Sequence, residues 1–414
     1  MHPQHSTSLN WLVERVDAFN ADERDHPGMT IAILAESGRG DTARAIAFAE
    51  AVRGRYIDAH ITLFTQYDGT MAKWDMAAFA KTCGVIDAHM TCHRLPPGAL
   101  VSALHNKFSV VYDAMPMAVK AYWRIAAHVP ADLQIEADQR LAPYRILYDG
   151  HPIDNWRLKF TGQSQWEIMG NSSGFDVTPQ GLSVATPLDC GPFPEADELP
   201  PGEKLDALKE AAGGSMWSKA KLSGVGKYVV IHDSSGPRCN NKLPPVAVFE
   251  AIAAKFHENG VRLIQVGLKG ETRIKWTVDR LGLRLGLTNR IIKGAAALID
   301  IEGFLPYMAF GLGTPAVVLF GPTPAMVYGF PGNYNLIRGD AERNQAACMM
   351  GTCFWGGGWS AGENWAETCR LGKTHNPEWP CCLNFMRPED AAERSWSFVR
   401  QLVEGPMQPM EAVA

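Results

Sequence analysis

The sequence lacks the features that mark several large classes of protein. It has no run of 18 or more apolar residues that is free of acids and of several glycines or prolines, and residues 1–30 lack a secretory signal pattern. No internal repeat or low-complexity tract occurs. The net charge of -5 and the pI near 6.2 leave no basic excess for nucleic-acid binding. We therefore expect a cytoplasmic protein without a transmembrane segment that binds no nucleic acid.

Common catalytic and nucleotide-binding motifs are also missing. No Walker, Gly-x-Gly-x-x-Gly or Gly-x-Ser-x-Gly pattern occurs in the context that each requires, which argues against kinases, dehydrogenases and serine hydrolases of those types. What the chain does have is length and apolar content. Its 414 residues, 46% apolar and 20% charged, predict a globular protein of two domains.

Residues 300–323 predict a ligand-binding edge of a parallel sheet. Ala316 to Phe320 is a short apolar run, typical of a strand buried on both faces, and Gly321-Pro322-Thr323 ends it abruptly. Glu302-Gly303 opens the preceding edge. Ligands of open α/β sheets bind beyond the carboxyl ends of the strands, so we expect a ligand at these two loops. By composition alone, the stretch also suits a buried helix and strand with a tight turn.

Strands and helices alternate on both sides of a polar, proline-rich stretch, residues 143–201, which we interpret as a domain boundary. In the first half, a glycine-rich turn that ends in Asp41 follows a predicted strand. The elements expected there are strands at 29–35, 59–65 and 108–112 and a helix at 42–56. Those expected in the second half are helices at 203–212, 246–259 and 387–403 and strands at 228–232 and 262–267. The predicted division is an extension 1–27, domains 28–200 and 201–386, and a crossover helix and tail 387–414.

Several of these stretches resemble glycosyltransferase family 9, the heptosyltransferases of bacterial lipopolysaccharide synthesis. The family's donor signature has an acid followed by small residues, a histidine, Leu-Gly-Thr-Pro, an apolar strand and Phe-Gly-Pro-Thr. Glu302, Gly303, Leu312 to Pro315 and Phe320 to Thr323 are in register with it. Phe304 replaces a glycine of the signature, and Tyr307 stands where the family usually has its histidine.

The resemblance implies a role for Asp41. Arg39-Gly40-Asp41 matches the family's Leu-Gly-Asp, whose aspartate is the proposed general base. A carboxylate in an interdomain cleft could accept the proton that an acceptor hydroxyl loses on attack. The alternative is that Asp41 only caps the helix that we expect to begin at Thr42.

The resemblance also implies a donor-binding set. Lys242 and Pro245 match the family's Lys-x-Trp-Pro, in which the lysine meets donor phosphate. A lysine beside a helix N-terminus suits a diphosphate, although a solvated surface lysine is the alternative. The residues expected to bind the donor are Ser234, Ser235, Lys242, Glu271, Glu302, Gly303, Tyr307 and Thr323.

Five of the nine cysteines lie between Cys348 and Cys382. In a reducing compartment, this clustering indicates a metal site, and four thiolates can close a tetrahedral site for zinc or iron. The expected ligands are Cys348, Cys353, Cys369 and Cys381, with Cys382 as the alternative fourth. The segment is similar to the iron finger of bacterial autotransporter heptosyltransferases. The competing interpretation is that these are ordinary buried cysteines.

Together, these observations predict a GT-B architecture: two Rossmann-like domains facing a cleft, with a C-terminal Cys-rich metal-binding insertion at residues 345–383. The resemblance implies an inverting glycosyltransferase with an ADP-heptose-type donor, a glycan, lipopolysaccharide or protein acceptor, and no catalytic metal. Peripheral association with the inner membrane and a homo-oligomeric state are compatible with it. The alternative is a non-catalytic GT-B-fold binding or assembly protein with a structural metal, which the departures at Phe304 and Tyr307 favour.

Overall fold

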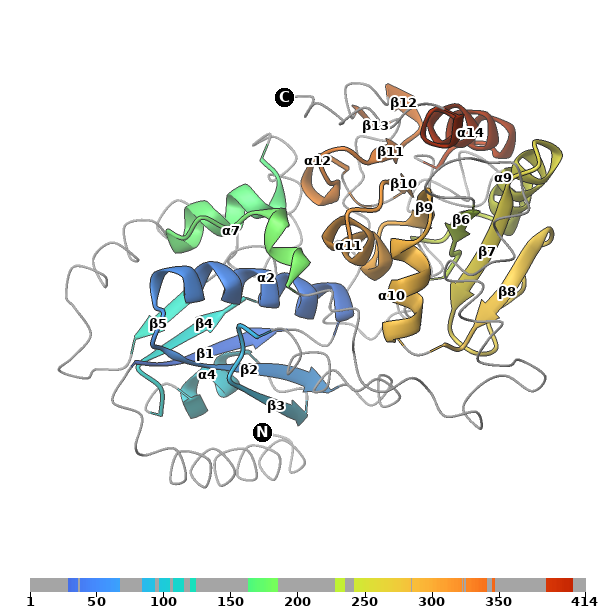
Figure 1. Ribbon diagram of the computed structural model, residues 1–414. Coiled ribbons are helices and arrows are strands. Elements are labelled where there is room, and N and C mark those ends of the chain that lie inside the picture. Colours follow the sequence, from blue (N-terminus) through green and yellow to red (C-terminus); the bar gives the residue numbers. More distant parts are fainter. Residues whose placement is uncertain are drawn as a thin grey trace. The chain divides into compact units, whose positions relative to one another are not determined.

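The computed structural model forms two compact units, residues 1–149 with 165–190, and residues 150–164 with 191–414. In each unit, helices flank a sheet (Figure 1). No helix in the described part of the chain is long and apolar enough to cross a membrane. The residues that the structure describes are 29–35, 38–67, 84–93, 97–104, 107–114, 120–123, 163–184, 228–234, 242–283, 285–321, 323, 325–340, 345–346 and 385–404.

The sheet of the first unit has the strand order β3-β2-β1-β4-β5. Strands β1 to β4 pair in parallel, whereas β5 runs antiparallel to β4 at the edge. Because the order reverses between β1 and β4, the carboxyl ends of these two strands flank the switch point at which α/β sheets bind ligands. The strands are β1 (Thr30–Ala35), β2 (His60–Tyr67), β3 (Ala88–His93), β4 (Val110–Asp113) and β5 (Lys120–Trp123).

Helices cover both faces of this sheet because strand β1 is apolar on both sides. Ala32 and Leu34 of β1 pack with Leu100 and Leu104 of helix α4 (Pro97–Leu104) in one buried cluster. On α2 (Arg39–Arg55), the ring of Phe48 packs edge to face against Tyr112 of β4 at 5.2 Å. Two further elements, α7 (Gln165–Ser173) and the 3-10 helix η1 (Pro179–Ser183), complete the described part of the unit.

The sheet of the second unit has six strands, all parallel, in the order β11-β10-β9-β6-β7-β8. Read from β8, this is the strand order 3-2-1-4-5-6 of doubly wound nucleotide-binding sheets. The switch point lies between β6 and β9. The strands are β6 (Tyr228–Ile231), β7 (Arg262–Gly267), β8 (Thr277–Leu281), β9 (Ala297–Ile301), β10 (Ala316–Leu319) and β11 (Tyr334–Leu336).

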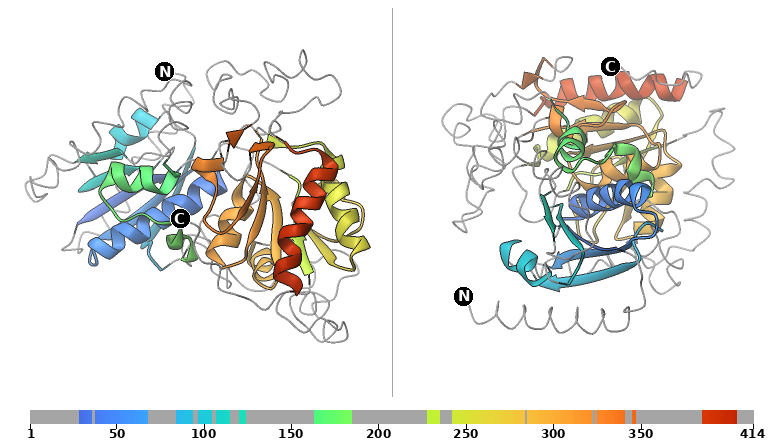
Figure 2. Two further views of the ribbon diagram at one scale, coloured as in Figure 1. Left: turned by 90° about the horizontal axis from the view of Figure 1, so that it is seen from above. Right: turned by 90° about the vertical axis from the view of Figure 1, so that its left-hand side faces the viewer.

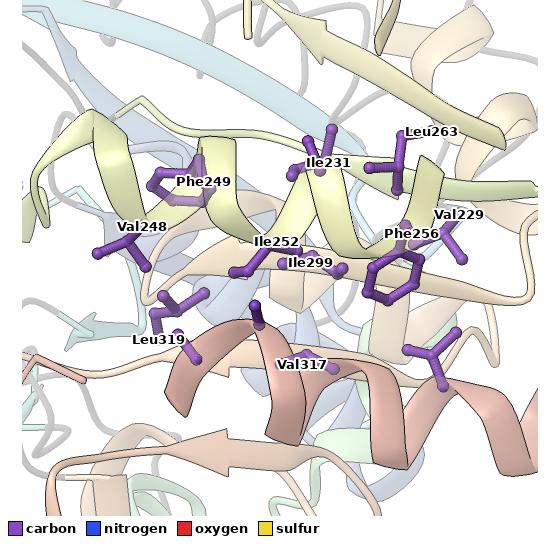
Figure 3. Close-up of a cluster of buried hydrophobic side chains, with 14 of the residues drawn as sticks. Val229, Ile231, Val248, Phe249, Ile252, Phe256, Leu263, Ile299, Val317 and Leu319 are labelled. Carbon is purple, nitrogen blue, oxygen red and sulfur yellow. The ribbon is translucent and has the colours of Figure 1, made fainter. Parts of the chain in front are cut away.

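Two helices pack together on one face of this sheet, α9 (Val246–Glu258) and α14 (Pro388–Glu404), as both views in Figure 2 show. Phe256 of α9 meets Trp396 of α14 edge to face at 5.4 Å, and Lys255 pairs with Glu393 at 2.6 Å. Ile252 and Phe256 of α9 lie over Ile299 and Val317 of the sheet (Figure 3). The sequence predicts that the last helix crosses to the first domain, whereas its described side chains pack in the second unit.

The other face of the sheet carries α10 (Leu285–Lys293) and α11 (Phe304–Gly311) (Figure 2). Thr314, which follows α11, donates from its hydroxyl to the carbonyl of Ile292 at 2.9 Å and so ties the end of α10 to the start of β10. The remaining described elements are the short helix α12 (Ala325–Tyr328) and the antiparallel pair β12 (Gly339–Asp340) and β13 (Gln345–Ala346).

One predicted boundary is wrong in a way that bears on function. Helix α2 begins at Arg39, not at Thr42, so Asp41 lies inside the first turn. The N-cap is Gly38, whose carbonyl accepts hydrogen bonds from the amide and the hydroxyl of Thr42 at 2.9 and 3.1 Å. No side chain caps the helix, so Asp41 is not its cap. The predicted extension 1–27 and helix 203–212 lie outside the described residues.

Candidate functional site

The second unit brings two strand ends together at its switch point. Strand β6 is followed by His232 and Asp233, and its neighbour β9 is followed by Glu302 and Gly303. The two strands pair in parallel, and the amide of His232 donates to the carbonyl of Ile299 at 3.0 Å. The side chains that follow β6 and β9 therefore share the ligand-binding edge of the sheet.

An ion pair joins the two predicted donor motifs at this edge. The ammonium group of Lys242 donates to Oε2 of Glu302, and both side chains are at most 12% exposed. Lys242 precedes α9, which begins after Pro245 without a side-chain cap. The unpaired backbone amides of the first turn of α9 therefore follow Lys242 closely in the chain, and Lys242 already pairs with Glu302.

The entrance to α11 is open beside this pair. Gly303 is the N-cap of α11, and again no side chain caps the helix. Apart from its chain neighbours and the helix itself, the described atom that a Cβ on Gly303 would meet within 4 Å is the carbonyl oxygen of Ile301, at 3.9 Å. The glycine therefore leaves space in front of the helix N-terminus, where backbone amides can receive an anionic group.

A half-buried histidine, His232, lies among the acidic groups, with 15% of its side chain exposed. Nδ1 of His232 is 2.8 Å from Oδ1 of Asp300, a β9 residue that is 1% exposed. The same oxygen accepts from the amide of Ile301 at 2.7 Å. On the other side of the imidazole, Nε2 is 3.9 Å from Oε2 of Glu271. The ring thus stands between two carboxylates that come from different strand ends.

Glu271 lies in the loop after β7, close to the end of that strand. Gly267, the last residue of β7, makes room for it, because a Cβ at Gly267 would overlap Oε2 of Glu271. This oxygen is buried and has no hydrogen-bond partner among the described residues. A carboxylate oxygen without a partner at the ligand-binding edge is suited to accept a hydrogen bond from a bound molecule.

The loop that carries Glu271 is fixed by Gln265 of β7. The side-chain amide of Gln265 donates to the carbonyl of Thr272 at 2.9 Å and to Oδ1 of Asp233 at 3.3 Å. Its oxygen accepts from the amide of Ile274 at 2.8 Å. One buried glutamine therefore links the loop after β7 to the residue after β6.

The acidic surroundings shift the pKa values of this cluster. Burial alone would lower the pKa of His232, but Asp300, Glu271 and Asp233 outweigh it and raise the pKa above the ordinary value of 6.5. Burial raises the pKa of Asp300, while His232 and the Ile301 amide act against that rise. Burial also raises the pKa of Asp233 to about 6, against the pull of His232. Shifts of this kind gather at functional sites.

Other predicted donor residues have different surroundings. Thr323 is 2% exposed, and its hydroxyl has no hydrogen-bond partner among the described residues. Tyr307 is buried in α11, where its ring packs edge to face on Phe330 at 5.0 Å. Ser234 directly follows Asp233, whereas Ser235 lies outside the described residues.

The predicted base, Asp41, belongs to the first unit. Oδ1 of Asp41 pairs with Nη2 of Arg44 at 2.7 Å, and Arg44, which is buried, also reaches the side chain of Gln165 on α7 at 3.5 Å. A Cβ on Gly38 would overlap Oδ2 of Asp41, so the glycine makes room for the carboxylate. Asp41 is thus a partly exposed, oriented carboxylate in the first turn of the helix after β1.

The predicted metal ligands lie outside the described residues, as does the whole of segment 347–384. Within the described ranges, no group of three or more His, Cys, Asp or Glu side chains could hold a metal ion. The cysteine cluster therefore stays a prediction.

Sequence reasoning missed His232, Asp233 and Asp300. The signal for Asp300 was an acid inside the apolar run 297–301, which a strand buried on both faces tolerates only with a partner. The signal for His232 and Asp233 was their position directly after the apolar run 228–231. Both patterns are visible in the sequence, but their pairing requires the order of strands in the sheet.

Comparison with known proteins gives structural matches only. No protein-family model matches the chain, and no curated protein matches it. Among solved structures, it resembles the iron-containing dodecameric glycosyltransferase TibC of enterotoxigenic E. coli, with a TM-score of 0.51 and 12% identity over 92% of this chain and 81% of that one. The likeness to TibC shows that this chain has the two-unit α/β fold of GT-B glycosyltransferases.

Two further matches are glycosyltransferases with lower TM-scores. One is the family 9 glycosyltransferase of Veillonella parvula, with a TM-score of 0.40 and 14% identity over 74% of this chain and 84% of that one. The other is the ADP-heptose lipopolysaccharide heptosyltransferase II of E. coli, with a TM-score of 0.39 and 13% identity over 75% of this chain and 91% of that one.

Proposed function

We propose that this chain is a glycosyltransferase that moves a sugar from a nucleotide donor to an acceptor hydroxyl. The observation that carries the proposal is the contact between Lys242 and Glu302 at the switch point between β6 and β9. A nucleotide sugar has a diphosphate next to a ring of hydroxyl groups. A cation and a carboxylate held side by side, next to uncapped helix N-termini, match that combination.

Each donor-binding residue has a role in this proposal. Lys242 and the first-turn amides of α9 and α11 hold the diphosphate, and Glu302 accepts a hydrogen bond from a sugar hydroxyl. Glu271 follows the second strand of the unit, the place from which an acid reaches the ribose in doubly wound nucleotide-binding sheets. Ser234, Ser235, Gly303 and Thr323 complete the set through their hydroxyl and backbone groups. Tyr307 has a packing role, because its ring holds α11 against Phe330.

The reaction is a displacement at the anomeric carbon. The acceptor oxygen forms a bond to that carbon while the bond to the diphosphate oxygen breaks, and the diphosphate leaves with the electron pair. The acceptor hydroxyl gives its proton to Asp41, which acts as general base. Lys242 and the helix amides stabilise the charge of the leaving diphosphate, so the mechanism needs no catalytic metal. A single displacement inverts the anomeric configuration.

The sequence resemblance supports an ADP-heptose-type donor, with a glycan, lipopolysaccharide or protein as the acceptor. The same resemblance supports a structural iron or zinc held by Cys348, Cys353, Cys369 and Cys381. TibC, which shares the fold, is an iron-containing glycosyltransferase. When bound, this metal would order the glycine-rich segment around the cysteines, and the transfer itself would not involve it.

A thermal-shift screen against nucleotide sugars tests the proposed function, followed by detection of the released nucleoside diphosphate. A donor at 100 times its dissociation constant should raise the free energy of unfolding by about 2.7 kcal/mol. Stabilisation by ADP-heptose with release of ADP in the presence of acceptor supports the transferase. Stabilisation without any release, with several acceptors and with water, would favour the non-catalytic binding protein.

A further inference from the structure

His232 lies between two carboxylates that have different tasks. Asp300, almost fully buried, contacts Nδ1 of the imidazole at 2.8 Å and is itself fixed by the amide of Ile301 at 2.7 Å. The ring orientation is therefore set by a buried, hydrogen-bonded carboxylate of strand β9. Nε2 then faces Glu271, at 3.9 Å from Oε2. That oxygen is buried without a hydrogen-bond partner among the described residues.

We infer that His232 is a positioning residue for nucleotide recognition: held by Asp300, it holds the Glu271 carboxylate in place for the ribose hydroxyl groups of the donor. The inference rests on the proposed function and adds a residue that acts through Glu271. Gln265 hydrogen-bonds to the backbone of the loop, at Thr272 and Ile274, and not to the Glu271 carboxylate, which packs against Gly267.

The geometry makes this positioning depend on one proton. With Nδ1–H donated to Asp300, a neutral imidazole turns the lone pair of Nε2 towards Glu271, which repels the carboxylate. A protonated imidazole presents an N–H there, which attracts it. Three charged groups face His232, and all are acidic: Asp300 from β9, Glu271 from the loop after β7, and Asp233, which follows His232 in the chain. Their charges favour the protonated form and hence the position suited to the ribose.

The contribution of the ribose therefore falls as the pH rises through the pKa of His232. The phosphates of the nucleotide also titrate, so a comparison is needed in which they cancel. ADP and 2′,3′-dideoxy-ADP carry the same phosphates and differ only in the ribose hydroxyl groups. The ratio of their dissociation constants isolates the contact that Glu271 makes.

Calorimetry of both nucleotides from pH 5.5 to 9 tests the inference, with pyrophosphate as a third probe. In the wild type, ADP should bind roughly tenfold more tightly than its dideoxy form at low pH, as expected for a hydrogen bond to a charged group, and this preference should shrink at high pH. His232→Gln, which keeps a donor but does not titrate, should retain the preference at every pH. Asp300→Asn should move the loss of preference to lower pH, because it removes the carboxylate that favours the protonated ring.

The outcomes separate this inference from the proposed function. His232→Ala should lose the preference while binding pyrophosphate as the wild type does. Equal weakening of ADP, dideoxy-ADP and pyrophosphate would mean that His232 contacts the phosphates or only supports the fold, and either result overturns the inference. A preference that does not vary with pH in the wild type also overturns the inference, but it leaves the proposed nucleotide site intact.

If wild-type protein binds neither ADP nor pyrophosphate, the proposed donor site itself is wrong. Should His232→Ala fail to fold, His232→Gln and Asp300→Asn decide alone.

Discussion

Lys242 and Glu302, which lie 60 residues apart in the chain, form an ion pair across the switch point of the second sheet. Lys242 comes from the segment between β6 and α9, and Glu302 directly follows β9. Both side chains are largely buried, so the pair is not one of the weak contacts of an exposed surface. A diphosphate that binds Lys242 competes with Glu302 for the ammonium group, which weakens the ion pair and makes the carboxylate available to a sugar hydroxyl.

Replacing Glu302 should therefore separate nucleotide binding from sugar binding. In Glu302→Gln, Lys242 loses its competing carboxylate, so ADP should bind roughly threefold to tenfold more tightly, equivalent to about 0.7–1.4 kcal/mol. The intact nucleotide sugar should bind more weakly than to the wild type, since the amide is a poorer acceptor for a hydroxyl group. Titration calorimetry with both ligands measures this, and a parallel change for the two would contradict the assignment.

Asp41→Asn should lower turnover by roughly 100-fold or more, which is the usual effect of losing a general base. We propose that the second unit binds the donor, so the dissociation constant of the donor should stay nearly unchanged. Steady-state kinetics and calorimetry on the same preparation provide both numbers. Wild-type turnover in this variant would remove Asp41 from the reaction.

A pair of glycines, one at each end of α2, offers a matched test of the position of the Asp41 carboxylate. A methyl group at Gly38 would overlap Oδ2 of Asp41, whereas one at Gly54 would meet nothing within 4 Å. Gly38→Ala should therefore displace the carboxylate and reduce turnover. Gly54→Ala should leave turnover unchanged and stabilise the helix by about 1 kcal/mol or less. Equal turnover in the two variants would show that the carboxylate position does not matter.

Asp233→Asn should stabilise the protein at alkaline pH and have little effect in acid. The folded pKa of Asp233, about 6, lies above the ordinary value of 3.8, so the native state disfavours the ionised form. Ionisation of Asp233 therefore lowers the free energy of unfolding of the wild type as the pH rises from about 4 through 6. The uncharged amide of Asp233→Asn avoids this loss. Melting temperatures of both proteins at pH 4.5 and pH 8 test this. A larger gain at pH 4.5 than at pH 8 would show that the sign is wrong.

The cysteine cluster should hold one metal ion per chain. Elemental analysis of protein purified without chelators should find about one iron or zinc, and Cys353→Ser should lose it, because a tetrahedral site with three thiolates is incomplete. Nucleotide binding by the second unit should persist in this variant. Metal-free wild-type protein that is folded and resistant to protease would instead favour ordinary buried cysteines.

The buried strands were the most predictable part of the fold. The apolar run that ends at Phe320 is strand β10 with both faces buried, and residues 262–267 form β7 as predicted. Such runs have few alternatives in an α/β chain. The start of α2 was predicted three residues late, since Arg39-Gly40-Asp41 has the composition of a turn and Gly40 weakens helix propensity.

The candidate site was predictable only where one stretch of chain carried a whole motif. Lys242 and Glu302 each belong to such a motif, yet their contact depends on β6 and β9 being neighbours, which no local pattern reveals. The contact between His232 and Asp300 has the same origin, because it joins residues 68 positions apart. Pairs of this kind are products of sheet topology, and neither residue alone differs from an ordinary buried polar side chain.

The proposed function depends above all on whether the switch point of the second unit binds a nucleoside diphosphate through Lys242. Titration calorimetry with ADP on the wild-type protein and on Lys242→Ala measures this binding. Lys255→Ala is the control, because Lys255 lies in the helix that follows Lys242 but pairs with Glu393. We expect saturable binding by the wild type and the Lys255 variant and at least tenfold weaker binding by Lys242→Ala, as for loss of a charged contact to phosphate. Equal ADP affinity in all three proteins would contradict it.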